Sequence, residues 1–287
     1  MRVAIGIATR GRPAILAEVL RELRQQTRQP DRIIVCHVAP EDIGERQPGV
    51  EYLTAPAGLP RQRNAIMAEC GDCDAVLFLD DDFLAAPAYL AATEAGFEAW
   101  PDVVVTTGTV LADGARGPGL SVAEGRAVLA RDAYAGAWLE AQPHFNGYGC
   151  NMAVRLSVVR EHGIRVDEAL PAYAWYEDID FTRALGRHGR IIRLAAARGV
   201  HLGVKVGRTP GLRLGYSQVA NSIYLARKGT YPWDHALRSV ARHCALNLAR
   251  SPWPEPWADR WGRFKGNMLA FLDLARGRMS PGRINEL

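Results

Sequence analysis

Three consecutive aspartates, Asp80, Asp81 and Asp82, directly follow five apolar residues at 75–79. Such a short apolar run is typical of a strand buried on both faces of a parallel sheet, and ligands of these sheets bind at the carboxyl ends of the strands. Because side chains alternate along an extended chain, Asp80 and Asp82 can point to one side and offer oxygen ligands to a divalent cation shared with substrate phosphates. The alternative is a turn that caps a helix predicted from Pro87, but capping needs only one aspartate.

A second acidic group, Glu177 and Asp178, follows the aromatic residues Trp175 and Tyr176 at the start of a predicted helix. The helix dipole favours carboxylates at such a position in any protein, which is the structural alternative. An aromatic platform beside paired carboxylates is also the combination that sugar binding and general-base chemistry need. We therefore predict that the two carboxylates are catalytic and that the aromatic pair contacts a sugar.

His201 is a candidate third metal ligand, because it follows a strand predicted at residues 190–198. A lone histidine is more often structural. An imidazole would complete a ligand set with the aspartates if this strand returns to them.

Two further segments carry groups that suit a nucleotide. Thr9 and Arg12 follow the first predicted strand, and Arg63 and Asn64 lie at the start of a predicted helix. Guanidinium groups match phosphate oxygens, and a helix N-terminus adds a favourable dipole. Each segment taken alone fits a solvated turn or a surface helix start about equally well.

The glycine-rich segment 145–152 contains Tyr148 and Asn151. Glycines allow the backbone to approach a ligand closely, and the asparagine amide can bond a hydroxyl-rich molecule. We predict that both residues bind an acceptor substrate. A plain structural turn before a helix at residue 155 is the alternative.

The elements that must position these residues alternate between strand and helix in the first hundred residues, which predicts a parallel, doubly wound α/β sheet. Strands are predicted at 3–8, 32–36, 50–54, 75–79 and 103–107, and helices at 13–26, 61–69 and 87–99. Residues 120–145 show little periodicity, and further helical patterns lie at 155–162, 177–188, 217–228, 234–250 and 255–276. We divide the chain into a nucleotide-binding half at 1–110, an acceptor-binding half of the same domain at 111–229, and a helical tail at 230–287.

The composition excludes several classes of protein. The 287 residues are 48% hydrophobic and 23% charged, as in an ordinary globular protein, and contain no apolar run of membrane-spanning length. The net charge of +4 belongs to residues 231–287, and no dense basic stripe indicates nucleic-acid binding. The N-terminus lacks a signal-peptide pattern, so we expect a cytoplasmic protein. The lone Cys70–Cys73 pair has no second pair for zinc.

Trp253, Trp257 and Trp261 recur at helical spacing in the tail, with basic residues nearby. We expect this stripe to pack on its own domain. The alternatives are a peripheral contact with an anionic membrane at the inner face, where lipid-linked acceptors reside, and a homodimer through the tail.

Taken in order, these segments resemble the inverting nucleotide-sugar glycosyltransferases of family 2, over roughly residues 1–205. The motifs that carry the resemblance are T-x-x-R at 9–12, Pro-Asp-Arg-Ile-Ile-Val at 30–35, Arg-Asn at 63–64, D-x-D at 80–82, the segment 149–155, and Glu-Asp at 177–178 with Arg183. The resemblance implies a GT-A-type fold, with a Rossmann-like, mostly parallel sheet flanked by helices and a C-terminal helical extension.

The resemblance also implies a role for each motif. Asp80 and Asp81 would bind the donor, while Asp82 and His201 would hold Mn²⁺ or Mg²⁺. Asp178 would be the general base on the acceptor hydroxyl. The residues that would line the nucleotide are Thr9, Arg12, Arg63 and Asn64. The donor would be a nucleotide-diphosphate sugar, a UDP-sugar first, and the acceptor a saccharide or a lipid-linked molecule in glycan or polysaccharide assembly.

One segment departs from the family pattern. Members usually carry a polar, Asp-containing turn after the second strand, which helps to hold the base, whereas this chain reads Val-Cys-His-Val-Ala-Pro at 35–40. His37, Glu41 or Asp42 would have to substitute for it.

Two other functions compete with the transferase. A non-catalytic glycan- or nucleotide-binding relative, acting as an assembly partner, would be expected to have degraded acidic motifs, yet both motifs are intact. A nucleotidyltransferase also uses aspartate–metal sites, but it would need an early glycine-rich, lysine-bearing loop that residues 9–12 do not supply.

Overall fold

A computed structural model describes residues 1–205 and 209–287 and divides the chain into two compact units. The first unit comprises Met1–Ala57, Arg61–Val166 and Phe181–Gly207. The second comprises Gly58–Pro60, Asp167–Asp180 and Arg208–Leu287. The helical tail thus forms one unit together with residues 167–180, a combination that the sequence pattern did not indicate.

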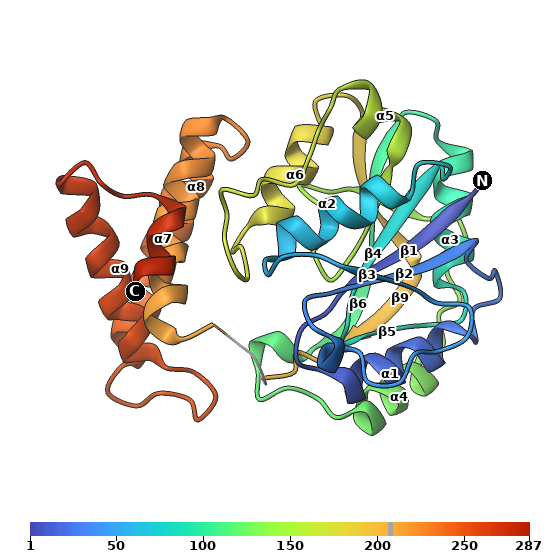
Figure 1. Ribbon diagram of the computed structural model, residues 1–287, viewed down its shortest axis with the longest axis horizontal. Coiled ribbons are helices and arrows are strands. Elements are labelled where there is room, and N and C mark those ends of the chain that lie inside the picture. The colour runs from blue at the N-terminus through green and yellow to red at the C-terminus, as the bar shows by residue number, and fades with distance from the viewer. Residues whose placement is uncertain (206–208) are drawn as a thin grey trace. The chain divides into compact units, whose positions relative to one another are not determined.

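The first unit is built on a nine-stranded sheet in the order β3-β2-β1-β4-β8-β6-β9-β5, with β7 also paired to β9 (Figure 1). The strands are β1 (Val3–Ala8), β2 (Arg32–His37), β3 (Glu51–Thr54), β4 (Ala75–Asp80), β5 (Phe83–Ala85), β6 (Val103–Asp113), β7 (Ala141–Pro143), β8 (Asn151–Arg155) and β9 (Arg190–His201). The strands β5, β7 and β8 run against the other six. The predicted mostly parallel α/β sheet is therefore confirmed.

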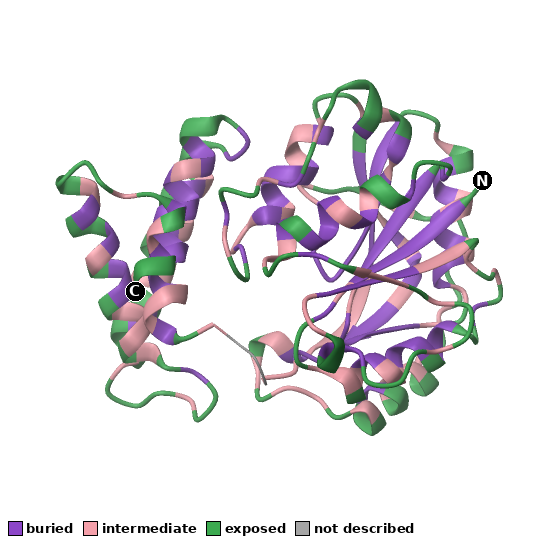
Figure 2. Ribbon diagram, viewed as in Figure 1, coloured by how far each residue is buried: buried purple, intermediate pink, exposed green. Residues whose placement is uncertain are grey.

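Helices cover both faces of this sheet. They are α1 (Pro13–Leu23), α2 (Leu59–Glu69), α3 (Tyr89–Ala99), α4 (Val122–Arg131), α5 (Leu156–Glu161) and α6 (Glu177–Leu185). Side chains of α1, α3 and α4 pack into one apolar cluster, and those of α2, α5 and α6 into another. Figure 2 shows the central strands largely buried, while the helices have exposed outer sides; the edge strand β3 and the short strand β7 are partly exposed. Burial of the strands on both faces explains why they read as continuous apolar runs.

Helix α1 shows how the sequence pattern and the structure diverge at an element end. Leu16, Val19, Leu20 and Leu23 are buried at the spacing of one helix face. The helix ends at Leu23 instead of residue 26, because the buried Gln26 side chain donates to Ala86 O and accepts from Leu90 N. These bonds tie the end of α1 to the start of α3.

Three short strands and one helix were not predicted. Helix α4 lies within the segment that shows little periodicity, and its start is marked by a capping box between Ser121 and Glu124. Strand β8 begins where a turn leading directly into a helix was expected, because five residues are too few to show a periodicity. It fills the centre of the sheet, between β4 and β6.

The second unit contains α7 (Gly211–Lys228), α8 (Trp233–Arg250), α9 (Arg260–Ala275) and the 3₁₀ turn η3 (Pro281–Glu286). Its core includes Tyr216, Val219 and Ala270. Glycines permit the close approach of α7 and α9, since a Cβ on Gly215 would lie 1.9 Å from Arg263 O. No helix within the described residues is long and apolar enough to cross a membrane.

The prediction that the three tail tryptophans lie on one helix is wrong. Helix α9 begins only at Arg260, where the Asp259 side chain accepts from Gly262 N, so Trp253 and Trp257 precede the helix. Trp253 is 81% exposed and Trp261 52%. The expectation that these side chains pack on their own unit is therefore not met by the described structure.

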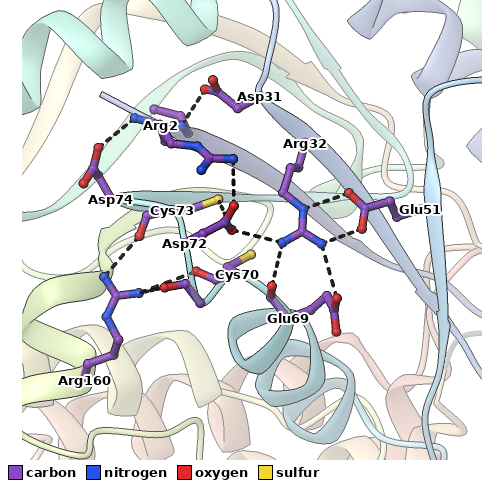
Figure 3. Close-up of polar contacts among 12 residues, drawn as sticks. Arg2, Asp31, Arg32, Glu51, Glu69, Cys70, Asp72, Cys73, Asp74 and Arg160 are labelled. Atoms are coloured by element: carbon purple, nitrogen blue, oxygen red, sulfur yellow. Dashed lines mark hydrogen bonds and ion pairs between the residues drawn. The ribbon is translucent and has the colours of Figure 1, made fainter.

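Charged side chains tie together the amino ends of several strands (Figure 3). Arg32 pairs with Glu51 and Asp72, and Arg160 donates to the carbonyl oxygens of Cys70 and Cys73. Burial raises the pKa of the Cys70 thiol to about 12. Thiols of high pKa are poor nucleophiles, so we infer that this Cys-x-x-Cys turn has a structural role.

Candidate functional site

The three aspartates lie where β4 ends, at the carboxyl edge of the parallel strands β1, β2 and β4. One oxygen each of Asp80 and Asp82 and one ring nitrogen of His201 all lie within 4.8 Å of one another. Strand β9 brings the histidine there, because Phe83 of β5 pairs with His201. The predictions that the two aspartates face one side and that β9 returns to them are both confirmed.

Asp81 takes part in a different set of contacts. Its carboxylate accepts from Thr9 Oγ1 at 2.7 Å and from an Arg12 guanidinium nitrogen at 2.9 Å. Burial raises the pKa of Asp81 to about 7, against the opposing effect of the Arg12 charge. The same guanidinium lies 3.5 Å from Asp82. The Arg12 charge therefore offsets the repulsion among the three adjacent carboxylates, and the Thr9 hydrogen bond fixes the position of Asp81.

His201 is oriented by a residue that sequence reasoning missed. Its Nδ1 lies 2.9 Å from Asp113 Oδ1, while its Nε2 lies 3.3 Å from Asp82 Oδ1 and 3.7 Å from Asp80 Oδ2. Because a carboxylate can only accept, Nδ1 carries a proton and Nε2 is the nitrogen presented to the aspartates. Burial alone would lower the pKa of His201, but the hydrogen bond to Asp113 and the nearby carboxylates of Asp82 and Asp80 raise it to about 10. The carboxylates thus favour a positive charge at this place.

Asp113 ends β6 and accepts from Ala115 N and from the Tyr148 hydroxyl, each at 3.0 Å, besides His201. Burial raises its pKa, but the His201 hydrogen bond outweighs this and lowers it to about 2. The sequence did offer a signal for Asp113, because an acid followed by Gly114 ends a segment that begins with β-branched residues. It was missed because the strand was expected to end at residue 107. Tyr148, predicted to bind an acceptor, packs edge-on against the His201 ring at 6.1 Å between ring centroids.

The residues present fit a divalent cation. Asp82 Oδ1 is buried and makes no well-formed hydrogen bond within the part of the chain that the structure describes, although His201 Nε2 lies 3.3 Å away, while Oδ2 accepts from Val204 N at 2.8 Å. An orphaned carboxylate oxygen beside a second carboxylate and an oriented imidazole is a donor set that suits Mn²⁺ or Mg²⁺.

Three residues predicted to face a substrate are instead held in the interior. Arg63 is buried beneath the acidic turn, donating to Gly149 O at 2.6 Å and lying 3.4 Å from Asp80. Asn64 exchanges two hydrogen bonds with the backbone of Val166. Buried Asn151 accepts from Thr107 Oγ1 at 2.7 Å. In the described structure these three side chains therefore bond to groups within the unit, whereas Thr9 and Arg12 contact the acidic turn itself.

The segment before α6 has an unusual backbone. Ala172, Ala174 and Tyr176 all have positive φ angles, of 57°, 53° and 72°. Left-handed backbone at a residue other than glycine costs on the order of 1–3 kcal/mol and tends to cluster at functional sites. The Tyr176 hydroxyl lies 2.6 Å from Ser239 Oγ, and the Trp175 ring lies edge-on to His243. Packing within the second unit thus fixes the predicted aromatic platform.

The acidic residues in the first turn of α6 have different surroundings. Asp180 is buried and accepts from Thr230 at 2.5 Å and Lys228 at 2.6 Å, so it serves the packing of the second unit. Glu177 is also buried. Asp178 is only half-buried, so it is the most solvent-accessible of these three carboxylates.

Comparison with known proteins places the fold. No family model matches the chain, and no curated protein matches it in sequence. Among solved structures, a mannosyltransferase from Pyrobaculum calidifontis in complex with GDP-Man and Mn²⁺ matches with a TM-score of 0.57 at 14% identity, over 96% of this chain and 88% of the other. GalNAc-T7 with UDP, GalNAc and Mn²⁺ matches with a TM-score of 0.58 at 13% identity, over 100% and 56%.

A third similar structure is TarS from S. aureus. Its fragment 1–349 in complex with UDP-GlcNAc matches with a TM-score of 0.57 at 13% identity, over all of this chain and 84% of the fragment. The longer TarS structure matches at 14% identity with a TM-score of 0.53, over 89% of this chain, and the match spans 44% of the TarS chain. At such low identity the similarity concerns the fold, which is the GT-A-type α/β fold that the family resemblance implied.

Proposed function

We propose that this protein is a metal-dependent glycosyltransferase that uses a nucleotide-diphosphate sugar. The observation that carries the proposal is the Asp80, Asp82 and His201 cluster at the carboxyl edge of the parallel strands. Its support from outside the chain is the shared fold, since the similar structures include transferases solved with GDP-Man, UDP-GlcNAc or Mn²⁺.

In this proposal Asp80, Asp82 and His201 hold Mn²⁺ or Mg²⁺. Such a cation, when bound, offsets the negative charge of a nucleoside diphosphate leaving group. Asp113 holds the His201 ring so that Nε2 faces the cation. Arg12 and Thr9, already joined to Asp81, border the place where the nucleotide lies.

Asp178 is the proposed general base, which takes the proton of the acceptor hydroxyl as its oxygen attacks the anomeric carbon from the face opposite the leaving group. The product then has inverted configuration. The partial exposure of Asp178, in contrast to buried Glu177 and Asp180, supports its assignment as the base. A carboxylate with an ordinary pKa near 4 is a weak base. It suffices because the hydroxyl proton is lost late, after positive charge has developed on the sugar.

The first experiment measures thermal stabilisation by nucleoside diphosphates with and without Mn²⁺. We expect at least one diphosphate to raise the melting temperature only when Mn²⁺ is present, and we expect Asp82→Asn to abolish that increase. Asp132→Asn is a matched control, because Asp132 pairs with Arg198 away from the cluster. If no nucleotide gives a metal-dependent shift, the transferase proposal is contradicted.

The second experiment separates chemistry from binding. Asp178→Asn removes the basic oxygen while keeping the side-chain size, so we expect nucleotide and Mn²⁺ binding to persist and turnover to fall by about 10²–10⁴-fold. Full activity in this variant would exclude Asp178 as the base. A non-catalytic relative would bind the nucleotide but turn over no donor at all, with or without the substitution.

We also propose that the tail meets an anionic membrane surface, where a lipid-linked acceptor would lie. The second unit exposes Trp253, Trp261 and Phe271, and its exposed cations include Arg276 and Lys265, whose Nζ lies 5.3 Å from the centre of the Trp261 ring. Exposed aromatic and basic side chains together are typical of interfacial binding. Co-sedimentation with phosphatidylglycerol vesicles, and none with phosphatidylcholine, is expected, and Trp253→Ala with Trp261→Ala should abolish it. A concentration-dependent dimer without vesicle binding would favour the homodimer instead.

A further inference from the structure

The second unit contains a cavity of about 320 Å³ between helix α7 and the segment 279–282, which includes the start of the turn η3. Ala220, Tyr224 and Arg227 line it from α7, and Ala169 lines it from the segment 167–180 of the same unit. Pockets that bind small molecules have volumes of about 300–1,000 Å³ and mostly apolar walls with a few polar groups. The cavity is therefore large enough for a small ligand, and it shares no residue with the metal cluster.

Small residues explain why this space is open. Ala169 and Ala220 carry only a methyl group, and Gly282 carries no side chain. A Cβ built on Gly282 would have one neighbour within 4 Å, Ser280 Oγ at 4.0 Å, so position 282 faces free space. A larger side chain at this position would enter the cavity without displacing any other group.

The larger lining residues make the walls mostly apolar. Met279 and Pro281 contribute only apolar side-chain groups, apart from the weakly accepting sulfur of the methionine. The Tyr224 hydroxyl donates to Asp167 Oδ2 at 2.8 Å, which fixes the Tyr224 ring as a wall. Water inside such a cavity finds few hydrogen-bond partners, so an apolar group is favoured there.

One positive charge lies at the wall of this apolar space. Exposed Arg227 lines the cavity and has no hydrogen bond or ion pair with any residue that the structure describes. The next residue, Lys228, is instead held by Asp167 at 2.5 Å and by Asp180 at 2.6 Å. A guanidinium group matches phosphate oxygens through two parallel hydrogen bonds. A ligand with an apolar part and a phosphate would therefore satisfy both features of the cavity.

We propose that this cavity binds a lipid phosphate, with the phosphate on Arg227 and the first part of the hydrocarbon chain between α7 and the segment 279–282. A methylene group occupies about as much space as a water molecule, roughly 30 Å³, so the cavity has room for about ten of them. The inference goes beyond the proposed function, because the site lies in the second unit and needs neither a nucleotide nor a metal ion.

The test is calorimetric titration of the full-length protein with octyl phosphate at pH 8, below the concentration at which this ester forms micelles. Octanol, which has the chain alone, and inorganic phosphate, which has the charge alone, are titrated in parallel. We expect octyl phosphate to bind at one site, and each of the two partial ligands to bind at least about ten-fold more weakly.

Two substitutions examine the two halves of the site. Arg227→Gln removes the charge and should weaken octyl phosphate binding by about ten-fold. Gly282→Leu fills the cavity and should weaken it by a similar factor. If Gly282→Leu fails to fold, Ala169→Leu fills the same space from an exposed position. Arg242→Gln is the matched control, since Arg242 is an exposed arginine of α8 outside the cavity, and its affinity should stay within about two-fold of the wild type.

Each other outcome overturns the proposal. Inorganic phosphate that binds as tightly as octyl phosphate would show that the chain has no site, and octanol that binds as tightly would remove the role of Arg227. Unchanged affinity in the cavity-filling variant would place the ligand elsewhere, and absence of octyl phosphate binding would refute the site altogether. All of these results leave the proposed metal site untouched, because nucleotide and Mn²⁺ binding are measured separately.

Discussion

The contact between Asp113 and His201 supports a quantitative prediction, because Asp113 touches no candidate metal ligand other than that histidine. Asp113 Oδ1 lies 2.9 Å from His201 Nδ1 and accepts its hydrogen bond. This contact keeps Nε2 directed at Asp80 and Asp82. Replacing Asp113 with asparagine keeps the shape but removes the charge and one accepting oxygen. The ring then loses both its fixed tautomer and the nearby negative charge that favours a cation.

The loss of metal affinity can be estimated from other proteins in which a carboxylate orients a metal-binding histidine. Removing a carboxylate that orients a metal-binding histidine typically weakens metal binding by about 10–100-fold, which corresponds to roughly 1.4–2.7 kcal/mol. We expect Asp113→Asn to weaken Mn²⁺ binding by this factor. The assay is calorimetric titration of Mn²⁺ into the protein with a saturating nucleoside diphosphate.

Asp132→Asn is the matched control for this measurement. The two carboxylates have almost the same side-chain exposure, 15% for Asp113 and 16% for Asp132, and each is hydrogen-bonded to a side chain of β9. Asp132 pairs with Arg198, so its loss should leave the Mn²⁺ affinity unchanged. An affinity for Mn²⁺ in Asp113→Asn within about two-fold of the wild type would refute the orienting role.

Two further predictions concern the second unit. Asp180→Ala leaves Lys228 and Thr230 without their shared acceptor, so chemical denaturation should show a loss of roughly 2 kcal/mol in unfolding free energy. A loss below about 0.5 kcal/mol would show that these two hydrogen bonds are not stabilising. Burial, helped by the charges of Arg242 and its neighbours, lowers the pKa of His243 from 6.5 to about 4. As the pH falls, His243 is therefore protonated in the unfolded chain before it is protonated in the folded protein. The free energy of unfolding is unaffected above about pH 6.5 and falls by up to about 3 kcal/mol as the pH drops towards 4. Denaturation of the wild type and His243→Gln at pH 8 and pH 5 checks this, and an equal pH dependence in the two would contradict it.

The sequence predicted those features that depend on local pattern. The apolar run before Asp80 indicated a doubly buried strand, and the alternation of side chains correctly placed Asp80 and Asp82 on one side. The strand that leads to His201 was also predicted, although β9 continues to His201 instead of ending at residue 198. These features are local, or follow from one rule about the carboxyl ends of parallel strands.

The residues that were misplaced depend on tertiary contacts. Nothing near Arg63 or Asn64 in the sequence shows that Gly149 O and Val166 would bond their side chains from across the unit. Asp113 was missed because β6 continues through residues of mixed polarity, and its length is fixed by pairing with β9. Such partners lie dozens of residues away, so local pattern does not reveal them.

The release of nucleoside diphosphate from a panel of UDP- and GDP-sugars is the measurement that tests the central claim most directly. It can be followed without knowledge of the acceptor, because a transferase slowly passes its donor to water. We predict release from at least one nucleotide sugar that requires Mn²⁺ or Mg²⁺, stops with chelator, disappears in Asp82→Asn and persists in Asp132→Asn. Release from none of the donors by folded protein with Mn²⁺ present, or release that Asp82→Asn leaves unchanged, would contradict the account.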